Sequence, residues 1–187
     1  MSNDATAAAA SSATTWEFDP AHSHAHFKVR HMMIANVKGE FGKLSGTATL
    51  DSADMTRSSV EATIDAASLN TREPQRDAHL KSADFLDVEH YPTLAFQSTK
   101  IDRTPDGGLE LTGNLTIRGV TRPVTFQLDG PTPETKDPWG NTKVGVEATA
   151  TIDRKDFGLV WNTTLETGGV LVGDKVIIMV DAELIKK

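Results

Sequence analysis

The sequence predicts an all-β fold, a closed antiparallel barrel of eight or nine strands with one main helix. Three observations predict it: apolar and polar residues alternate over most of the chain, turn residues separate the alternating segments, and one segment breaks the alternation. Alternation places one face of each strand in a core and the other face in water, as in antiparallel sheets. A barrel removes the exposed edges that so many consecutive strands would leave, and a two-sheet sandwich is the alternative.

Period-two alternation identifies the strands. The clearest segments are 60–65, 109–117, 124–129, 144–153 and 176–184. Shorter runs at 16–18, 24–30, 41–50 and 93–101 complete the set. Glycine- and proline-rich turns separate them, at 105–108, at 118–119 and over the longer loop 131–140. The consecutive order of these strands predicts a meander.

One stretch, residues 73–87, carries helical rather than strand spacing. Asp77, Leu80 and Asp84 recur at intervals of three and four. Pro74 suits a first helical turn, and Thr71 is a candidate for capping the start. We therefore expect the main helix here, inserted between two strands.

Composition excludes several classes of function. The chain has 187 residues, a formal net charge of −7 and no cysteine. Without cysteine there is no disulfide framework, thiolate nucleophile or cysteine zinc site. Excess negative charge disfavours nucleic acid and anionic lipid surfaces as partners, and no apolar run is long enough to predict a membrane span.

Residues 1–15 are small, polar and low in complexity, which predicts a disordered tail before one barrel domain over residues 16–187. The tail lacks the charged and apolar regions of a secretory signal. We therefore expect a cytoplasmic protein.

Small residues recur on the predicted inward faces of the strands, namely Ala25, Ala62, Gly113, Ala148 and Ala150. An eight-stranded barrel can either fill itself with side chains or hold one small ligand. Small inward residues leave room for an extended apolar ligand, unless large residues on the opposite wall fill the space.

His22, His24 and His26 would share one face if they lay on a single strand. Three imidazoles could hold Zn²⁺, Ni²⁺ or Cu²⁺, but neighbouring side chains on a strand face are about 7 Å apart. No carboxylate lies at a matching spacing. We expect no physiological metal and no cofactor, and a metal-responsive role for the triplet is an alternative.

A compact charged cluster, Arg76, Asp77 and His79, lies at the start of the predicted helix. Asp77 and His79 could form an oriented base, although no recognised nucleophile motif accompanies them. The simpler interpretation is that Arg76 and Asp77 tie the helix to the barrel through hydrogen bonds.

The chain resembles the YceI-like family of lipocalin-like polyisoprenoid-binding proteins. The segments that carry the resemblance are DPAHS (19–23), FKVRHM (27–32), VKGEF (37–41), RDAHLKSADFLD (76–87), YP (91–92), LTIRGVT (115–121), RKDFG (154–158) and VGD (172–174). The resemblance implies an elongated, eight-stranded lipocalin-like barrel with a long apolar tunnel that holds an isoprenoid chain. His24 and His26 depart from the family pattern, which argues against a family metal site.

We therefore expect a non-enzymatic protein that carries or sequesters a polyprenyl phosphate or a quinone tail, with a loosely implied role in stress response. The expected apolar lining residues are Phe27, Val29, Phe41, Leu80, Phe85, Phe96 and Trp161. His22, Arg76 and His79 are candidates for contacts to a polar head or to the helix. The alternative is an enzyme that acts on a small hydrophobic substrate through His79 and Asp77. A homodimer is also plausible for a barrel with exposed strands.

Overall fold

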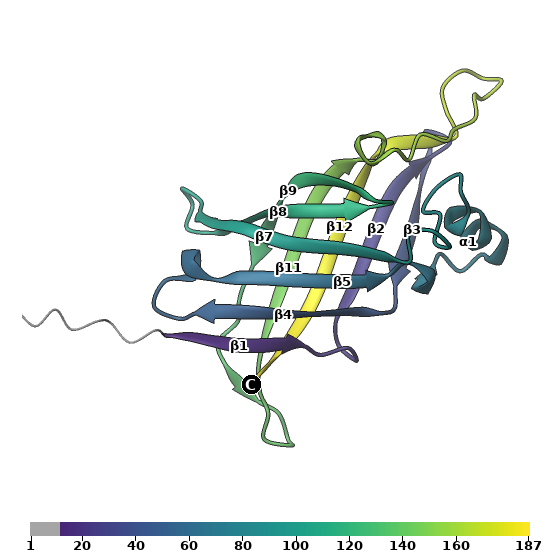
Figure 1. The fold of residues 1–187 in the computed structure, drawn as a ribbon. Helices are drawn as coiled ribbons and strands as arrows, with labels where there is room; N and C mark the ends of the chain where they lie inside the picture. Colours follow the sequence, from purple (N-terminus) through teal and green to yellow (C-terminus); the bar gives the residue numbers. More distant parts are fainter. Residues whose placement is uncertain (1–11) are drawn as a thin grey trace, which may run out of the picture.

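The structure, a computed structural model, describes residues 12–187 as a closed antiparallel β-barrel with one α-helix at one end (Figure 1). This confirms the predicted class and barrel. The strands are β1 (Ala13–Phe18), β2 (His24–His31), β3 (Ala35–Phe41), β4 (Leu44–Asp51), β5 (Ser59–Asp65), β6 (Leu69–Asn70), β7 (Thr93–Arg103), β8 (Leu109–Ile117), β9 (Val120–Asp129), β10 (Thr135–Lys136), β11 (Thr142–Asp153) and β12 (Val172–Lys186). The helical elements are α1 (Pro74–Lys81) and three short 3₁₀ helices, η1 (Met55–Arg57), η2 (Ala66–Ser68) and η3 (Arg154–Phe157).

Eight strands close the ring, in the order β11, β9, β8, β7, β5, β4, β1 and β12, and β12 pairs back onto β11. Beyond the end of β1, the partner of β12 is β2, which pairs in turn with β3. The β2–β3 hairpin and the short β6 therefore extend the ring toward the end that carries α1.

The strand β12 closes the barrel because it pairs along both of its edges. On one side it pairs with β11 from Lys175 to Ile185. On the other side it pairs with β2 and then with β1, where Trp16 lies opposite Lys186. The two strands nearest the chain ends are thus neighbours in the sheet.

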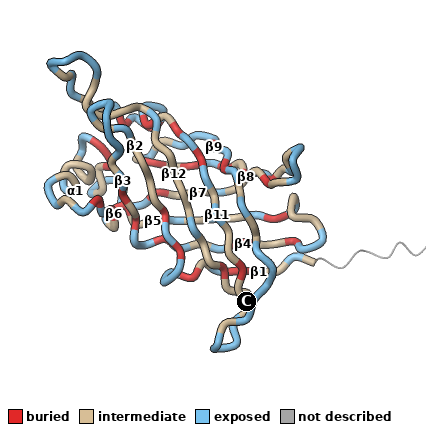
Figure 2. The backbone as a smooth tube through the Cα atoms, turned by 180° about the vertical axis from the view of Figure 1, so that it is seen from behind, coloured by how far each residue is buried: buried red, intermediate tan, exposed pale blue. Residues whose placement is uncertain are grey.

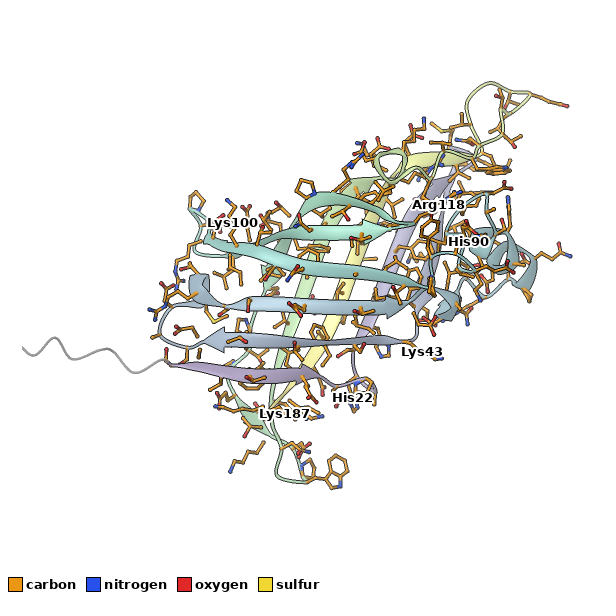
Figure 3. The ribbon with its side chains drawn as sticks, viewed as in Figure 1. His22, Lys43, His90, Lys100, Arg118 and Lys187 are labelled. Carbon is orange, nitrogen blue, oxygen red and sulfur yellow. The ribbon has the colours of Figure 1, made fainter. Side chains whose placement is uncertain are left out.

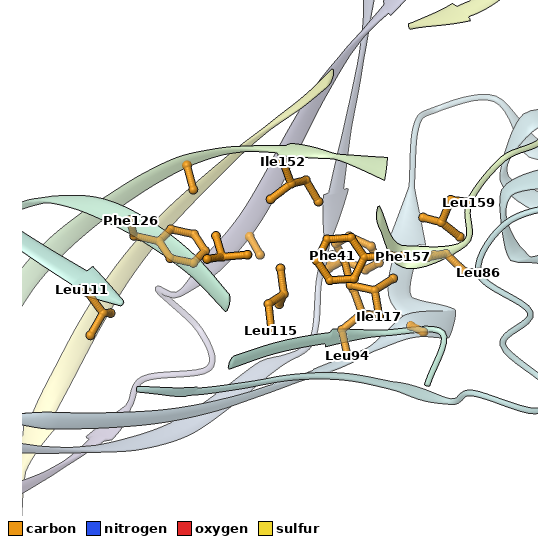
Figure 4. Packing of buried hydrophobic residues seen from close by; sticks show 14 of the residues in the cluster. Phe41, Leu86, Leu94, Leu111, Leu115, Ile117, Phe126, Ile152, Phe157 and Leu159 are labelled. Carbon is orange, nitrogen blue, oxygen red and sulfur yellow. The ribbon is translucent and has the colours of Figure 1, made fainter. Parts of the chain in front are cut away.

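Two walls enclose the interior. The strands β4, β5, β7 and β8 cross β11 and β12 at a steep angle on the opposite wall (Figure 1). Inward-facing residues from both walls meet in a cluster that includes Leu111, Leu115, Phe126 and Ile152 (Figure 4). A second, smaller cluster contains Trp16, Ala48, Val144 and Leu184. The alternation seen in the sequence produces this inward face.

The predicted boundary of the N-terminal tail lies too late in the chain, because residues 13–15 already belong to a strand. Residues 1–11 lie outside the described residues, but β1 begins at Ala13, before the predicted boundary at Trp16. Ala13 lies opposite Asp51 and Thr15 opposite Thr49, so pairing with β4 orders this segment. The Trp16 indole also donates a hydrogen bond to Thr14 Oγ1 at 2.8 Å.

The helix is shorter than predicted. Its start is capped by Glu73 rather than Thr71, because the Glu73 carboxylate accepts hydrogen bonds from the backbone N–H groups of Gln75 and Arg76. The helix ends at Lys81. After it, the backbone N–H groups of Phe85 and Asp87 both donate hydrogen bonds to the Ser82 carbonyl, which forms a tight turn. The tight turn replaces the last part of the predicted helix.

Candidate functional site

The interior of the barrel holds a cavity of about 260 Å³. Of the described residues that line it, only His26 and Arg154 carry polar side chains, and all the others are apolar. The volume lies just below the roughly 300–1,000 Å³ typical of small-molecule sites. A lining with so few polar groups favours an apolar guest over a polar one.

The cavity runs along both hydrophobic clusters, because residues of each cluster line it. Its lining includes Leu115 and Phe126 of the first cluster, and Ala48 and Leu184 of the second. Ile178 faces inward yet stays only partly buried, because it borders the hollow instead of other side chains. The cavity is therefore long rather than compact, which suits a chain-like guest.

The small inward residues act in two ways. Ala25, Ala62 and Ala148 line the cavity and create space, as their size predicts. Ala150 is buried in the core cluster and does not line the cavity. Gly113 lies beneath the Phe96 ring, so here the missing side chain admits an aromatic ring and leaves no open space.

Gly113→Ala should destabilise the barrel. A Cβ at this position would lie 2.5 Å from the Gln97 carbonyl oxygen, a backbone atom that cannot rotate away, and 2.4 Å from the Phe96 ring. We expect a loss of about 1–3 kcal/mol in the free energy of unfolding, measured by urea denaturation. Gly42→Ala is the matched control, because nothing lies within 4 Å of its added Cβ. Equal stability of the two variants would contradict the tight packing at Gly113.

Most of the apolar residues expected to line a pocket do border the cavity. They are Phe27, Val29, Phe41, Leu80, Phe85 and Phe96. The Phe27 and Phe41 rings lie 5.9 Å apart, and the Phe96 ring meets that of Phe126 edge-on at 5.3 Å. Leu80 comes from α1 and Phe85 from the turn after it, so the helix contributes to one end of the cavity wall.

Trp161 lies outside the cavity lining, contrary to expectation. Its ring packs edge-on against His79, with ring centroids 4.6 Å apart, and is tilted against Phe85 at 5.4 Å. These three rings join the segment after η3 to the segment around α1. Leu159, two residues earlier, is buried and lines the cavity from the same segment.

The charged cluster at the start of α1 ties the helix to the barrel. Asp77 Oδ1 accepts hydrogen bonds from the backbone N–H of Thr71 at 2.8 Å and from Thr71 Oγ1 at 2.5 Å. Arg76 donates to Thr71 Oγ1 at 2.7 Å and to the Thr71 carbonyl at 2.8 Å. Arg76 is not a cavity-lining residue, so its position does not support a contact to a ligand head.

His79 forms its hydrogen bond with Asp84 and not with Asp77. Its Nε2 lies 2.8 Å from Asp84 Oδ2, and its side chain is 40% exposed. The pair that the enzyme hypothesis requires is therefore not formed, because each partner is held by another residue. His79 is also absent from the cavity lining.

The three histidines do not share one strand face. His22 lies in the turn before β2, on the outside of the barrel, and its Nδ1 is 2.9 Å from Asp19 Oδ2 (Figure 3). The rings of His24 and His26, on β2, are 6.1 Å apart. The expected face is interrupted because β2 starts only at His24.

Carboxylates approach His22 from elsewhere in the fold, which the sequence spacing did not predict. Asp19, His22 and Glu183 bring three potential ligand atoms within 4.8 Å of one another. The Lys143 ammonium, however, lies 2.7 Å from Asp19 Oδ2 and 3.1 Å from Glu183 Oε2. Lysine thus supplies the positive charge at this cluster, which acts as an ionic link between the β1–β2 turn and the strands β11 and β12.

Asp19→Asn should weaken the barrel and change its response to acid. Hydrogen bonds from Lys143 and then His22 hold the pKa of the Asp19 carboxyl far below its usual range. A depressed pKa contributes stability above the unfolded value of about 3.9, and this contribution is lost as the pH falls through the folded value. We expect a loss of about 3 kcal/mol at pH 7 by urea denaturation and a shallower decline below about pH 4.

The control for this prediction is Asp129→Asn, which removes an exposed carboxylate from β9. It should leave the stability at pH 7 within about 0.5 kcal/mol of the unsubstituted chain. Identical pH profiles for Asp19→Asn and the unsubstituted chain would contradict the assignment of Asp19 to the ionic link.

Arg154 and His26 are the two polar lining residues that the sequence did not assign to the cavity, and Arg154 is the more deeply buried. It starts η3, is only 3% exposed, and lines the cavity beside apolar side chains. Its guanidinium donates to the carbonyls of Leu159 at 2.5 Å, Trp161 at 2.9 Å and Gly173 at 2.8 Å. Burial lowers the pKa of Arg154, whereas Asp174, 3.6 Å away, opposes that shift.

The hydrogen bonds of Arg154 hold the backbone of the segment that follows it. The segment 158–173 crosses one end of the barrel and has little regular structure of its own. Apart from its place in the RKDFG segment of the family resemblance, the only sequence signal was a basic residue directly after the long alternating strand. Nothing in that pattern indicates burial, because the carbonyls it binds come from a loop.

Comparison with known proteins identifies the family. The model of the YceI-like domain matches residues 16–184. The chain belongs to the YceI-like family. Among its relatives, a UPF0312 protein of Staphylococcus aureus is 34% identical over 171 residues, which cover 91% of this chain and 96% of the relative. A UPF0312 protein of Vibrio cholerae is 37% identical over 139 residues, or 74% of this chain and 73% of the relative.

Solved structures share the YceI-like barrel. The YCEI protein of Campylobacter jejuni matches with a TM-score of 0.70 and 29% identity, over 86% of this chain and 91% of that one. BcnA of Burkholderia cenocepacia matches with a TM-score of 0.75 and 23% identity, over 89% and 98%. A polyisoprenoid binding domain from Saccharophagus degradans matches with a TM-score of 0.64 and 13% identity, over 93% and 99%. The resemblance noted in the sequence is therefore confirmed.

Within residues 12–187, no helix combines the length and the apolar character that a membrane-spanning helix requires.

Proposed function

We propose that this YceI-like chain binds one elongated apolar lipid inside its barrel and carries or sequesters it without chemical change. The ligand class that fits is an isoprenoid chain, such as that of a polyprenyl phosphate or a quinone tail. The observation that carries the proposal is the long cavity with an almost wholly apolar lining. A solved structure of the same fold is described as a polyisoprenoid binding domain, which supports this class by analogy of fold.

The physical basis is the removal of apolar chain surface from water. Each buried square ångström contributes about 25 cal/mol, before the losses of ligand freedom. Every isoprene unit that enters the cavity repeats this contribution. Affinity should therefore rise with the number of isoprene units until the cavity is filled, and should depend less on the head group.

Native mass spectrometry of gently purified protein, followed by lipid extraction, tests the proposal. We expect an adduct of one lipid per chain that organic solvent releases as an isoprenoid. Added polyprenyl phosphates and quinones of increasing chain length should bind with increasing affinity. The absence of any copurifying lipid, together with no binding of the added ligands, would overturn the proposal.

A further inference from the structure

The β2–β3 hairpin ends in an exposed apolar tip, residues 32–34. Met32 is 42% exposed, Met33 55% and Ile34 76%. The neighbouring segment 158–171 adds Val160, which is 63% exposed. Figure 2 shows this end of the molecule as largely exposed. Apolar side chains at a projecting tip are not positioned to complete a core of their own.

The backbone holds the two methionines in an unfavourable conformation. Met32 and Met33 have φ angles of 50° and 63°, in the left-handed region that favours glycine or asparagine. The Ile34 N–H donates to the His31 carbonyl at 3.1 Å and closes the turn. Asparagine and glycine would form this turn with less strain. Turn stability therefore does not explain why methionines occupy these two positions.

The hairpin is basic although the chain is acidic. Lys28, Arg30 and Lys38 lie between residues 27 and 39, where the sequence has no acidic residue, whereas the whole chain has a net charge of −7. Lys28 lies directly opposite Lys38 in the strand pairing. Like charges in that position repel each other. The described part of the chain gives neither lysine an ion-pair partner, so an external anion would relieve the repulsion.

The tip lies at one end of the lipid cavity. Val29 lines the cavity from β2, and Val172, opposite His31, lines it from β12. The Met32 N–H donates to the Leu171 carbonyl at 2.8 Å, which joins the hairpin tip to the segment across this end of the barrel. A surface that contacts the tip therefore also contacts the end of the cavity.

We propose that the hairpin tip is a membrane-docking element that inserts Met32, Met33 and Ile34 into the interface of an anionic lipid bilayer. The apolar tip would lie at the boundary of headgroups and acyl chains, as in other interfacial elements. Lys28 and Lys38 lie about 15 Å back along the strands, given a rise of roughly 3.3 Å per residue, which places them just outside the headgroup layer, within about one Debye length of the phosphates. The proposal deepens the proposed function, because a bilayer is where an isoprenoid ligand resides.

The observations favour a bilayer over a protein partner. Met32, Met33 and Ile34 are exposed and line neither described cavity, so they offer a partner chain no pocket, whereas a fluid interface needs none. The paired lysines match a surface of many phosphates. Between residues 158 and 172 the sequence has one acidic residue, Glu166, and no basic one, so the hairpin and this segment together carry more positive than negative charges.

Vesicle cosedimentation tests the proposal with the full chain. Phosphatidylcholine vesicles with and without phosphatidylglycerol serve as probes. The variant Met32→Asn/Met33→Gly/Ile34→Thr removes the apolar tip but supplies the residues that the turn prefers, so the fold should be kept. The variant Lys28→Gln/Lys38→Gln removes the charge. Trp139→Ser is the matched control, because it removes a side chain that is 83% exposed in the turn between β10 and β11.

We expect the unsubstituted chain to bind vesicles that contain phosphatidylglycerol and to bind phosphatidylcholine alone much more weakly. The tip variant should lose binding at least tenfold, and the lysine variant about fivefold per lysine. Trp139→Ser should bind like the unsubstituted chain. Salt at about 1 M, where the Debye length is about 3 Å, should weaken binding.

Equal vesicle binding by the tip variant, or no binding by the unsubstituted chain, would overturn the proposal. So would light scattering that shows the tip joining two copies of the chain in solution. The test is separate from that of the proposed function. The tip variant should still carry lipid in native mass spectrometry, whereas a chain with a blocked cavity should still bind vesicles.

Discussion

Replacing Arg154 with alanine should lower the free energy of unfolding by about 4 kcal/mol, the largest loss that we expect from a single substitution in this barrel. The guanidinium donates to four backbone carbonyls, of Leu159, Trp161, Val172 and Gly173. Alanine would leave these carbonyls without their donor at a buried site. At about 2–4 °C per kcal/mol for a chain of this size, the melting temperature should fall by about 10 °C.

Circular dichroism melts and urea denaturation measure this loss, and hydrogen exchange locates it. We expect faster exchange in residues 158–173, which the guanidinium holds, than in β8 or β9. Arg154→Lys should recover only part of the stability, because an ammonium has three donors and lacks the planar fork. Arg122→Ala, an exposed arginine on β9, is the matched control and should change stability by less than about 0.5 kcal/mol. A comparable loss in that control would contradict the role of Arg154.

Ala148→Phe should abolish most lipid binding while the barrel stays folded. Ala148 lies on β11 between Leu128 of β9 and Val180 of β12, and its side chain borders the cavity. A phenyl ring here would occupy the space that an apolar chain needs. We expect at least a tenfold loss of affinity for a polyprenyl or quinone ligand, which corresponds to about 1.4 kcal/mol.

Thr149→Phe controls for the added bulk, because the neighbouring side chain points outward from the same strand and is exposed. Native mass spectrometry and ligand titration should show normal binding in this variant. The cost of overpacking at Ala148 should stay within about 1–3 kcal/mol, since the ring enters a hollow. Undiminished lipid binding by a folded Ala148→Phe chain would mean that the lipid binds elsewhere.

The sequence predicted the strands well because burial on one face imposes a period of two. The alternation at 144–153 corresponds to β11 and that at 109–117 to β8. It was less informative where the chain turns. The predicted helix over 73–87 ends at Lys81, because hydrogen bonds to the Ser82 carbonyl stop it. Such a stop depends on backbone geometry, which the spacing of apolar residues does not encode.

For the candidate site, sequence pattern indicated which residues face inward but not what they meet. Phe27 and Phe96 border the cavity as expected, while Trp161 packs outside it against His79. The link between Asp19 and Lys143 joins residues far apart in the sequence, so no local motif could indicate it. Arg154 shows the same limit, because its partners are carbonyls that a loop brings back to it.

The pairing of β12 with both β1 and β11 has a consequence for how the chain acquires its fold. These contacts join residues near opposite ends of the sequence, such as Trp16 and Lys186. Folds dominated by distant contacts fold slowly, because the entropy of closing a long loop is lost before the contacts form. During synthesis the earlier strands can form only an open sheet, since its last partner has not yet left the ribosome. The eight-stranded ring can therefore close around its cavity only after β12 has been made.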